Sequence, residues 1–256
     1  MKEFFGIGGY SRIPEGYLSW QHLAFVGSLL ALMVFLAVFF GVRNRKKDEK
    51  TKNRVLIIAA ILIDAFEIFK IVLNCVKADD PWRFRYDLPL FLCSIQLITI
   101  PIAAFSKGRL REAALDFVLI FGLLGAVLGT IGAGNNYSAY PVLSYDNVWS
   151  GITHSISGFS SLYIGISGMS SLKKKNIPIT FLIMAGFCGA AYIADILIPY
   201  NYMFLMRGDG TPYDIIYNLV NGNKVLYPLI VVLLFILYIA AFYGIYYLIT
   251  RKKKSK

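Results

Sequence analysis

Seven long stretches of apolar residues constrain this chain more than any other feature of its sequence. A helix that crosses a bilayer needs about 20 consecutive, mostly apolar residues. Windows of that kind cover residues 18–41, 55–76, 88–105, 113–133, 148–172, 177–199 and 225–249, and the connections between them are too short to hold a soluble domain. The sequence therefore predicts an all-α, polytopic membrane protein in which residues 1–256 form a single domain, a bundle of seven transmembrane helices.

The composition agrees with a lipid environment. Hydrophobic residues make up 57% of the chain and charged residues only 16%, compared with about 25% charged residues in an ordinary soluble domain. The net charge of +11 raises the question of nucleic acid as a partner, but the basic residues form no nucleic-acid-binding motif. We expect membrane lipids as partners and no nucleic acid.

The basic residues mark alternate loops, and this pattern predicts the orientation of the chain. Eighteen of the 26 lysines and arginines follow the first, third, fifth and seventh windows; they are Arg43, Arg45, Lys46, Lys47, Lys50, Lys52, Arg54, Lys107, Arg109, Arg111, Lys173, Lys174, Lys175, Arg251, Lys252, Lys253, Lys254 and Lys256. Cytoplasmic loops carry the excess of Lys and Arg. We therefore expect a multi-pass plasma-membrane protein with its N-terminus outside and its C-terminus in the cytoplasm.

Two local patterns predict further elements. The fifth window carries small residues at three- and four-residue spacing, among them Ser157, Gly158 and Ser161. Such a stripe lets neighbouring helices approach closely, so we expect this helix to be central and well packed. Residues 212–220 have apolar side chains at helical spacing, which predicts a short helix lying on the outer surface.

Ionisable side chains inside the membrane are the best pointers to function, because they usually face a bundle interior or a cavity. Glu67, Lys70 and Asn74 form one stripe on the second window, with Asp64 beside it. The other windows carry His22, Cys93, Gln96, His154 and Asp195. Counting about 1.5 Å of rise per residue from the outer end of each window places these groups in the outer half of the bilayer. The sequence thus predicts a single polar cavity open to the outer leaflet or to the outside.

The Glu67 and Lys70 pair has two interpretations. Residues three apart on a helix can form an ion pair that only fixes helix packing, or the two charges can contact a substrate. Metal binding by the histidines, Asp195 and Glu67 is a competing chemistry, although the sequence has no tight metal motif. No cofactor is expected.

The cysteines also leave alternatives open. Cys75, Cys93 and Cys188 all lie within predicted spans, so no structural disulfide is expected. A lone cysteine in a membrane helix is usually a small buried hydrophobe. A cysteine at the same depth as a histidine can instead form an activated thiolate, with the imidazole as base, and accept an acyl group.

Three stretches of the chain carry a resemblance: residues 88–94, residues 153–154, and Asp195 with residues 201–206. Together they resemble the YwaF family of bacterial integral membrane proteins. Residues 88–94 read Leu-Pro-Leu-Phe-Leu-Cys-Ser and resemble the proline and cysteine motif that opens the family's third helix, although Phe91 stands where the family commonly has histidine. Residues 153–154, Thr-His, open the fifth helix. Asp195 and residues 201–206 resemble the family's closing segment with its Asn-Tyr-Met core. The resemblance covers about helices two to seven.

The bacterial family is similar to an animal transmembrane family that includes a phospholipid acyltransferase, thought to use a cysteine and a histidine within the membrane. This resemblance implies that Cys93 is a nucleophile and His154 its general base, in a bacterial cell membrane. Substrate binding is then expected at His22, Glu67, Lys70, Gln96, Asp195 and Asn201. The leading hypothesis is an intramembrane acyltransferase or another lipid-modifying enzyme. The alternative is a protein that binds or transports a small solute through Glu67 and Lys70.

Overall fold

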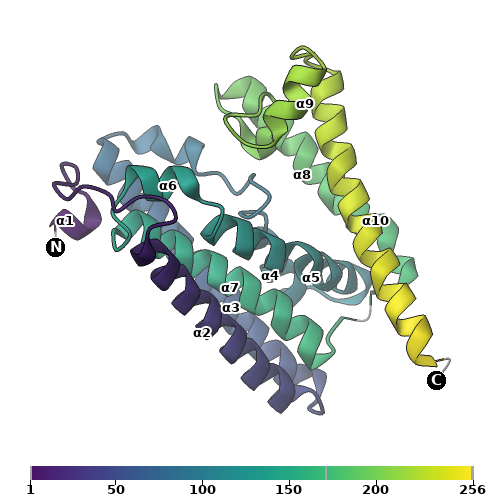
Figure 1. Cartoon of the computed structure of the whole chain (residues 1–256). Coiled ribbons are helices and arrows are strands. Elements are labelled where there is room, and N and C mark those ends of the chain that lie inside the picture. The colour runs from purple at the N-terminus through teal and green to yellow at the C-terminus, as the bar shows by residue number, and fades with distance from the viewer. Residues whose placement is uncertain (1, 171, 255–256) are drawn as a thin grey trace. The chain divides into compact units, whose positions relative to one another are not determined.

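The computed structural model describes residues 2–170 and 172–254, with side chains as far as residue 248, and all regular secondary structure in these ranges is helical (Figure 1). The α-helices are α1 (Lys2–Phe5), α2 (Trp20–Asn44), α3 (Glu49–Ala78), α4 (Gln96–Phe105), α5 (Gly108–Thr130), α6 (Gly134–Ala139), α7 (Tyr145–Ser167), α8 (Ile177–Leu197), α9 (Tyr213–Leu219) and α10 (Leu226–Lys254). Short 3-10 helices are η1 (Pro81–Tyr86), η2 (Lys174–Asn176) and η3 (Tyr202–Phe204). The basic side chains predicted as a C-terminal anchor, residues 251–256, lie outside the described side chains.

The described residues divide into two compact units. Unit 1 comprises the described residues within Met1–Asp87 and Gln96–Ser171, and it contains helices α1 to α7. Unit 2 comprises Leu88–Ile95 and the described residues within Leu172–Lys256, and it contains helices α8 to α10. The segment Leu88–Ile95 therefore packs with the C-terminal helices. The single seven-helix domain stays a prediction.

Helix α7 is the centre of unit 1, where it packs against α2, α3 and α5. Its small residues permit this: Ser157 and Ser161 donate hydrogen bonds to backbone carbonyls of α5, at 3.3 and 2.8 Å. A Cβ on Gly158 would lie 2.4 Å from Sδ of Met33 on α2, which no real contact allows. The predicted central, closely packed helix is confirmed.

The third apolar window forms a shorter helix than we predicted. Instead of a span over residues 88–105, the structure has turns before Gln96 and the ten-residue helix α4 after it. Pro89 lacks an N–H and disfavours a helical conformation at the residue before it. The Phe91 ring packs on Tyr202 of unit 2, with ring centroids 5.2 Å apart. Ten helical residues rise about 15 Å, only half of the roughly 30 Å hydrocarbon core.

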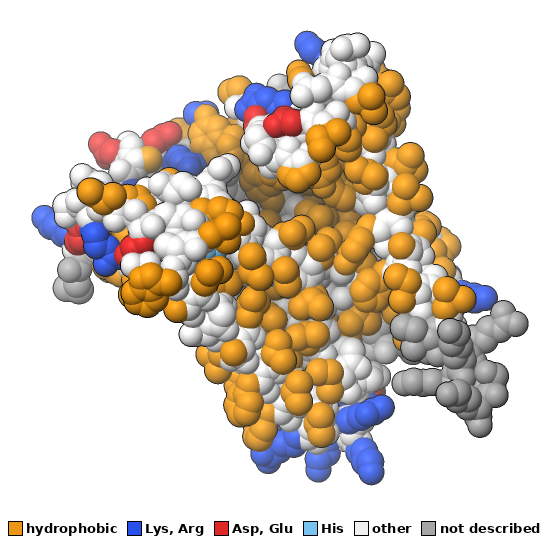
Figure 2. Space-filling model, viewed as in Figure 1, with side chains coloured by type: hydrophobic (Ala, Val, Ile, Leu, Met, Phe, Trp, Pro, Cys, Tyr) orange, Lys and Arg blue, Asp and Glu red, His pale blue; other side chains and the backbone are white. Residues whose placement is uncertain are grey.

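Four helical segments within the described residues are long and apolar enough to cross a membrane: Trp20–Asn44, Gly108–Ala139, Lys174–Leu197 and Leu226–Leu248. Figure 2 shows hydrophobic side chains over the flanks of the helices, with Lys and Arg gathered where α2 turns into α3. This distribution suits a bilayer, whose core accepts apolar side chains and whose surface attracts basic ones. The count of seven crossings and the orientation of the termini stay predictions.

The residues before α2 are tied to the beginning of α7. The Tyr10 hydroxyl donates to Asp146 at 2.5 Å, and Nζ of Lys77 lies 2.9 Å from the same carboxylate. Burial, followed by the neighbouring Asp146, raises the pKa of Tyr10. The Glu15 carboxylate accepts the Val142 N–H at 2.7 Å, and despite burial this hydrogen bond holds the pKa of Glu15 below its usual value. These contacts hold the N-terminal segment against the loop that precedes α7.

Unit 2 is built on α8 and α10, which pack against each other. The Tyr227 hydroxyl of α10 donates to the Phe204 carbonyl at 2.7 Å, and the hydroxyls of Thr180 and Tyr243 lie 3.3 Å apart. The short helix predicted over residues 212–220 is present as α9, and its Ile215 and Leu219 side chains are exposed. The unit thus consists of two long helices bridged by a connecting segment that holds η3 and α9.

Candidate functional site

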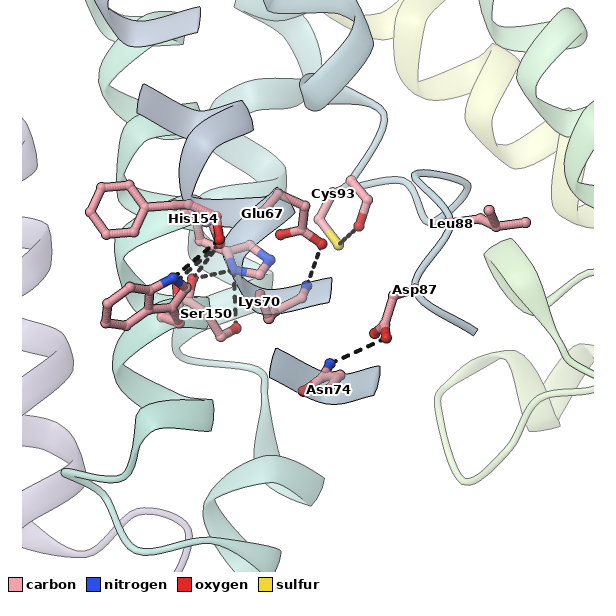
Figure 3. A network of polar contacts seen from close by, with 12 residues as sticks. Glu67, Lys70, Asn74, Asp87, Leu88, Cys93, Ser150 and His154 are labelled. Atoms are coloured by element: carbon pink, nitrogen blue, oxygen red, sulfur yellow. Dashed lines mark hydrogen bonds and ion pairs between the residues drawn. The ribbon is translucent and has the colours of Figure 1, made fainter. Parts of the chain in front are cut away.

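The His154 imidazole on α7 is held by its own helix. Its Nδ1 lies 2.7 Å from the Ser150 carbonyl and 3.3 Å from the Ser150 hydroxyl (Figure 3). A carbonyl oxygen only accepts hydrogen bonds, so Nδ1 carries the proton of the neutral ring. The lone pair of the ring is therefore on Nε2, the nitrogen that can act as a base.

Gly129 on α5 makes room for this ring. A Cβ built on Gly129 would lie 2.0 Å from both Nε2 and Cδ2 of His154, far inside van der Waals contact. The imidazole therefore packs directly on the α5 backbone, with its Nε2 edge at Gly129. Any larger residue at position 129 has to displace the ring.

Glu67 and Lys70 form an ion pair on α3, and Glu67 is the more buried partner, with its side chain 9% exposed. Helix α3 is joined to α7 one residue before Glu67, where the Trp149 indole donates to the Phe66 carbonyl at 3.1 Å. In Figure 3 the ion pair and His154 lie at about the same level of unit 1. The ion pair, one of the two interpretations of Glu67 and Lys70, is present. A role of the pair in contacting a substrate stays a prediction.

His22, predicted to bind substrate, is completely buried. Its Nδ1 accepts the Leu18 N–H at 3.1 Å, and its ring packs on Tyr137 with centroids 4.0 Å apart. Because Nδ1 is an acceptor, the ring proton is on Nε2, which is buried and has no hydrogen-bond partner among the described residues. The structure gives His22 a place beside the N-terminal segment and α6.

The remaining predicted polar groups of unit 1 pair locally. Gln96 is fully buried at the beginning of α4, where its Oε1 accepts the Thr99 hydroxyl at 3.0 Å. Asn74 donates to Asp87 at 3.2 Å. Asp64 is half-buried, one turn before Glu67. Gln96 and Asn74 thus have partners of their own in unit 1, and the single polar cavity stays a prediction.

Cys93 belongs to unit 2, in the turn that precedes α4. Its thiol is half-buried and lies 3.9 Å from the Ser94 hydroxyl. The neighbouring Phe91 anchors the segment by packing on Tyr200, Tyr202 and Phe204, with centroids 5.2 to 6.1 Å apart. His154 lies in unit 1, so the predicted pairing of Cys93 with His154 stays a prediction.

Asp195 and Asn201 organise the segment that follows α8. Asp195 accepts the Tyr202 N–H at 2.7 Å through Oδ1, while its Oδ2 is buried without a partner among the described residues. Asn201 donates to the Arg207 carbonyl and to Asp209, both at 2.8 Å, and accepts the Met206 N–H at 2.9 Å. Although burial opposes it, hydrogen bonds from Asn201 and Arg207 hold the pKa of Asp209 below its usual value. Asn201 therefore has a structural role, and its binding of a substrate stays a prediction.

Sequence reasoning missed the two residues that define the geometry of His154. Ser150 lies four residues before His154 on the same helix, a spacing that could have signalled the contact. Gly129 lies on another helix, and no pattern in the sequence links it to position 154. None of the three cysteines forms a disulfide, and the described residues contain no cluster of three His, Cys, Asp or Glu side chains able to hold a metal ion.

Comparison with known proteins gives one positive finding. The model of the TMEM164 family, a family of membrane proteins, matches residues 17–246, which is most of the chain. The match supports neither the narrower resemblance to YwaF proteins nor a bacterial origin. No curated protein and no solved structure matches the chain.

Proposed function

Because the chain belongs to the TMEM164 family of membrane proteins, we propose that it is an intramembrane enzyme that transfers acyl chains between lipids. In this proposal Cys93 is the nucleophile and His154 the general base. The chain crosses a bacterial plasma membrane seven times, as in YwaF proteins, with its N-terminus outside and its C-terminus in the cytoplasm. The α4 region, shorter than a full helical span, completes its crossing through the segment Leu88–Ile95.

The observation that carries the proposal is the state of His154. The Ser150 carbonyl holds the proton on Nδ1 and leaves Nε2 with the lone pair that a base requires. The ring keeps this orientation because its Nε2 edge packs on Gly129. A neutral imidazole with a defined tautomer is what thiol activation needs.

The proposed reaction has two steps. First, Nε2 of His154 takes the Cys93 thiol proton, and the thiolate attacks the ester carbonyl of a phospholipid. A thioester forms at Cys93, and the departing lysophospholipid oxygen receives the proton from His154. In the second step Nε2 takes the proton of an acceptor hydroxyl, whose oxygen attacks the thioester. The acylated acceptor leaves, and the Cys93 thiol regains its proton.

Unit 1 also offers room for an acyl chain. A groove of about 350 Å³ lies between α2, α3 and α7, and its walls include Met33, Phe40, Ile58 and Ile156. Ser155, next to His154 in sequence, is the polar residue of its lining. A cleft of this size and apolar character suits a hydrocarbon tail.

The test is acyl transfer by purified full-length protein in nanodiscs that contain acyl-labelled phospholipid and unlabelled lysophospholipid. We expect Cys93→Ala and His154→Gln each to reduce transfer at least 100-fold, as loss of a nucleophile or its base does. Cys75→Ala and Cys188→Ala, which remove the other two thiols, serve as matched controls and keep wild-type transfer. Label on Cys93 that hydroxylamine releases would identify the thioester. Wild-type turnover in both variants would overturn the proposal.

A second candidate function follows from the buried Glu67 and Lys70 pair. A charged pair in a membrane helix also suits a binding or transport site for a small polar solute. Solute uptake into vesicles that survives Cys93→Ala and is lost in Glu67→Gln would favour it. Acyl transfer that survives Glu67→Gln would favour the enzyme.

A further inference from the structure

Unit 2 contains a groove between α8 and α10 that the proposed chemistry does not use. Its volume is about 330 Å³, and its lining residues include Cys188, Gly189, Tyr192, Leu205, Lys224 and Pro228. Both helices are among the segments long and apolar enough to cross a membrane. In a membrane protein, an acyl chain suits the apolar length of a groove between two such helices.

One end of the groove is charged. Lys224 lies two residues before α10 and is exposed, and no described acidic side chain forms an ion pair with it. Tyr217 and Tyr227 pack on each other close by in sequence, with centroids 5.2 Å apart, as aromatic residues do at the headgroup level of a membrane. A lysine at this level attracts an anionic phosphate, while the wall below it accommodates a tail.

We propose that this groove is a binding site for one anionic glycerophospholipid, with its phosphate at Lys224 and one acyl chain along Gly189 between α8 and α10. The site does not require acyl transfer, and it lies outside the Ser150, Gly129 and His154 arrangement of unit 1. Leu205 of the groove wall follows Phe204, which packs on Phe91 with centroids 6.1 Å apart. The groove wall is thus one residue in sequence from a ring that packs on the Cys93 segment.

Gly189 provides a sharp test, because a Cβ built there meets no atom within 4 Å. A side chain at position 189 therefore starts in open space, and Gly189→Leu narrows the groove. Gly244→Leu is the matched control: position 244 is equally open and lies on α10, but it does not line the groove. Lys224→Gln removes the charge, and Lys175→Gln removes a lysine of the same unit that lies away from the groove.

The probes are phosphatidylglycerol and phosphatidylcholine with a photoreactive group on one acyl chain, each added in trace amounts to phosphatidylcholine nanodiscs that hold the full-length protein. Cross-linked peptides are mapped by mass spectrometry. We expect phosphatidylglycerol to label α8 and α10 about fivefold more than phosphatidylcholine does, the effect of one lysine near an anionic headgroup. Lys224→Gln should remove this preference, and Gly189→Leu should remove the labelling by both lipids. Gly244→Leu and Lys175→Gln should label as the wild type does.

Two results would overturn the proposal: equal labelling of the wild type by both lipids, or unchanged labelling of Gly189→Leu. The same measurement on Cys93→Ala separates this site from the proposed reaction, because labelling requires no turnover. Loss of acyl transfer with intact labelling would contradict the proposed enzyme and support the lipid site. Acyl transfer without selective labelling would contradict the lipid site and support the enzyme.

Discussion

Nδ1 of His154 donates to the backbone carbonyl of Ser150 at 2.7 Å, one helical turn earlier. This contact determines which ring nitrogen can accept a proton, and Gly129 determines where that nitrogen lies. The residues that prepare His154 for chemistry are thus a carbonyl and a glycine, neither of which contributes a functional side chain.

Replacing Gly129 by alanine should reduce acyl transfer, because the new Cβ displaces the imidazole. A misplacement of about 1 Å costs about 100-fold in rate. Nitrogen NMR of the imidazoles reports the displacement directly, and the chain has only two histidines. Gly165→Ala is the control, because its Cβ meets only the end of the Leu119 side chain, at 3.2 Å. Unchanged turnover and unchanged His154 resonances in Gly129→Ala would show that the glycine does not position the ring.

Replacing Lys70 by methionine should destabilise the protein, because Glu67 would remain buried without its counter-charge. Breaking a buried pair costs about 3 kcal/mol or more, whereas removing both charges costs much less. We therefore expect Glu67→Gln combined with Lys70→Met to be more stable than Lys70→Met alone, measured by unfolding in mixed micelles. Arg83→Met breaks the more exposed pair with Asp87 and should cost about 1 kcal/mol or less. If the losses in free energy of unfolding from Glu67→Gln and Lys70→Met simply add in the double variant, the two side chains do not stabilise each other.

Acid should loosen the contact between the N-terminal segment and the loop that precedes α7. The pKa of Glu15 is lowered in the folded protein, so the ionised carboxylate stabilises the fold above the usual pKa of a glutamate. This stabilisation is lost as the pH falls through the lowered value. The Val142 amide donates to Glu15, so its protection against hydrogen exchange, relative to an unfolded amide at the same pH, should fall below about pH 4. In Glu15→Gln the Val142 amide should be less protected at neutral pH, and its protection should depend much less on pH. If the pH dependence of this protection is unchanged in the variant, another group causes it.

Replacing Asn201 by alanine should loosen the segment that follows α8. The Met206 N–H and the Asp209 carboxylate lose a partner. Because Met206 is half-buried and Asp209 is exposed, water can replace that partner and the cost is about 1 kcal/mol. Limited proteolysis of residues 203–212 measures the loosening. Asn218→Ala, at an exposed position on α9, should leave the cleavage rate unchanged. Reduced substrate affinity in Asn201→Ala without faster proteolysis would instead support the predicted binding role.

Local patterns predicted the helices well where each helix follows from its own residues. Six of the seven apolar windows correspond to α2, α3, α5, α7, α8 and α10, and the surface helix over residues 212–220 corresponds to α9. The third window was too long because its first eight residues are apolar but not helical. Pro89 was visible in the sequence, but the packing of Phe91 on Tyr202 was not, since it joins residues more than 100 positions apart.

The candidate site was predictable only in part. Glu67 and Lys70 form their ion pair as their three-residue spacing suggested, because helical geometry alone brings them together. The sequence placed His22, Gln96 and Asp195 in the same half of the bilayer, but the structure gives each a separate partner. Depth along a helix does not determine which face of the helix a side chain occupies after packing.

The sequence by itself determined that this chain belongs in lipid and where its helices lie, because apolar length and loop charge are properties of consecutive residues. Only the tertiary structure decided that residues 88–95 join the C-terminal helices and that Gly129 bounds the His154 ring. Those contacts depend on how α5 packs on α7 and on which aromatic rings Phe91 contacts. Packing of that kind results from the shapes of surfaces distant in the chain, and no local spacing encodes it.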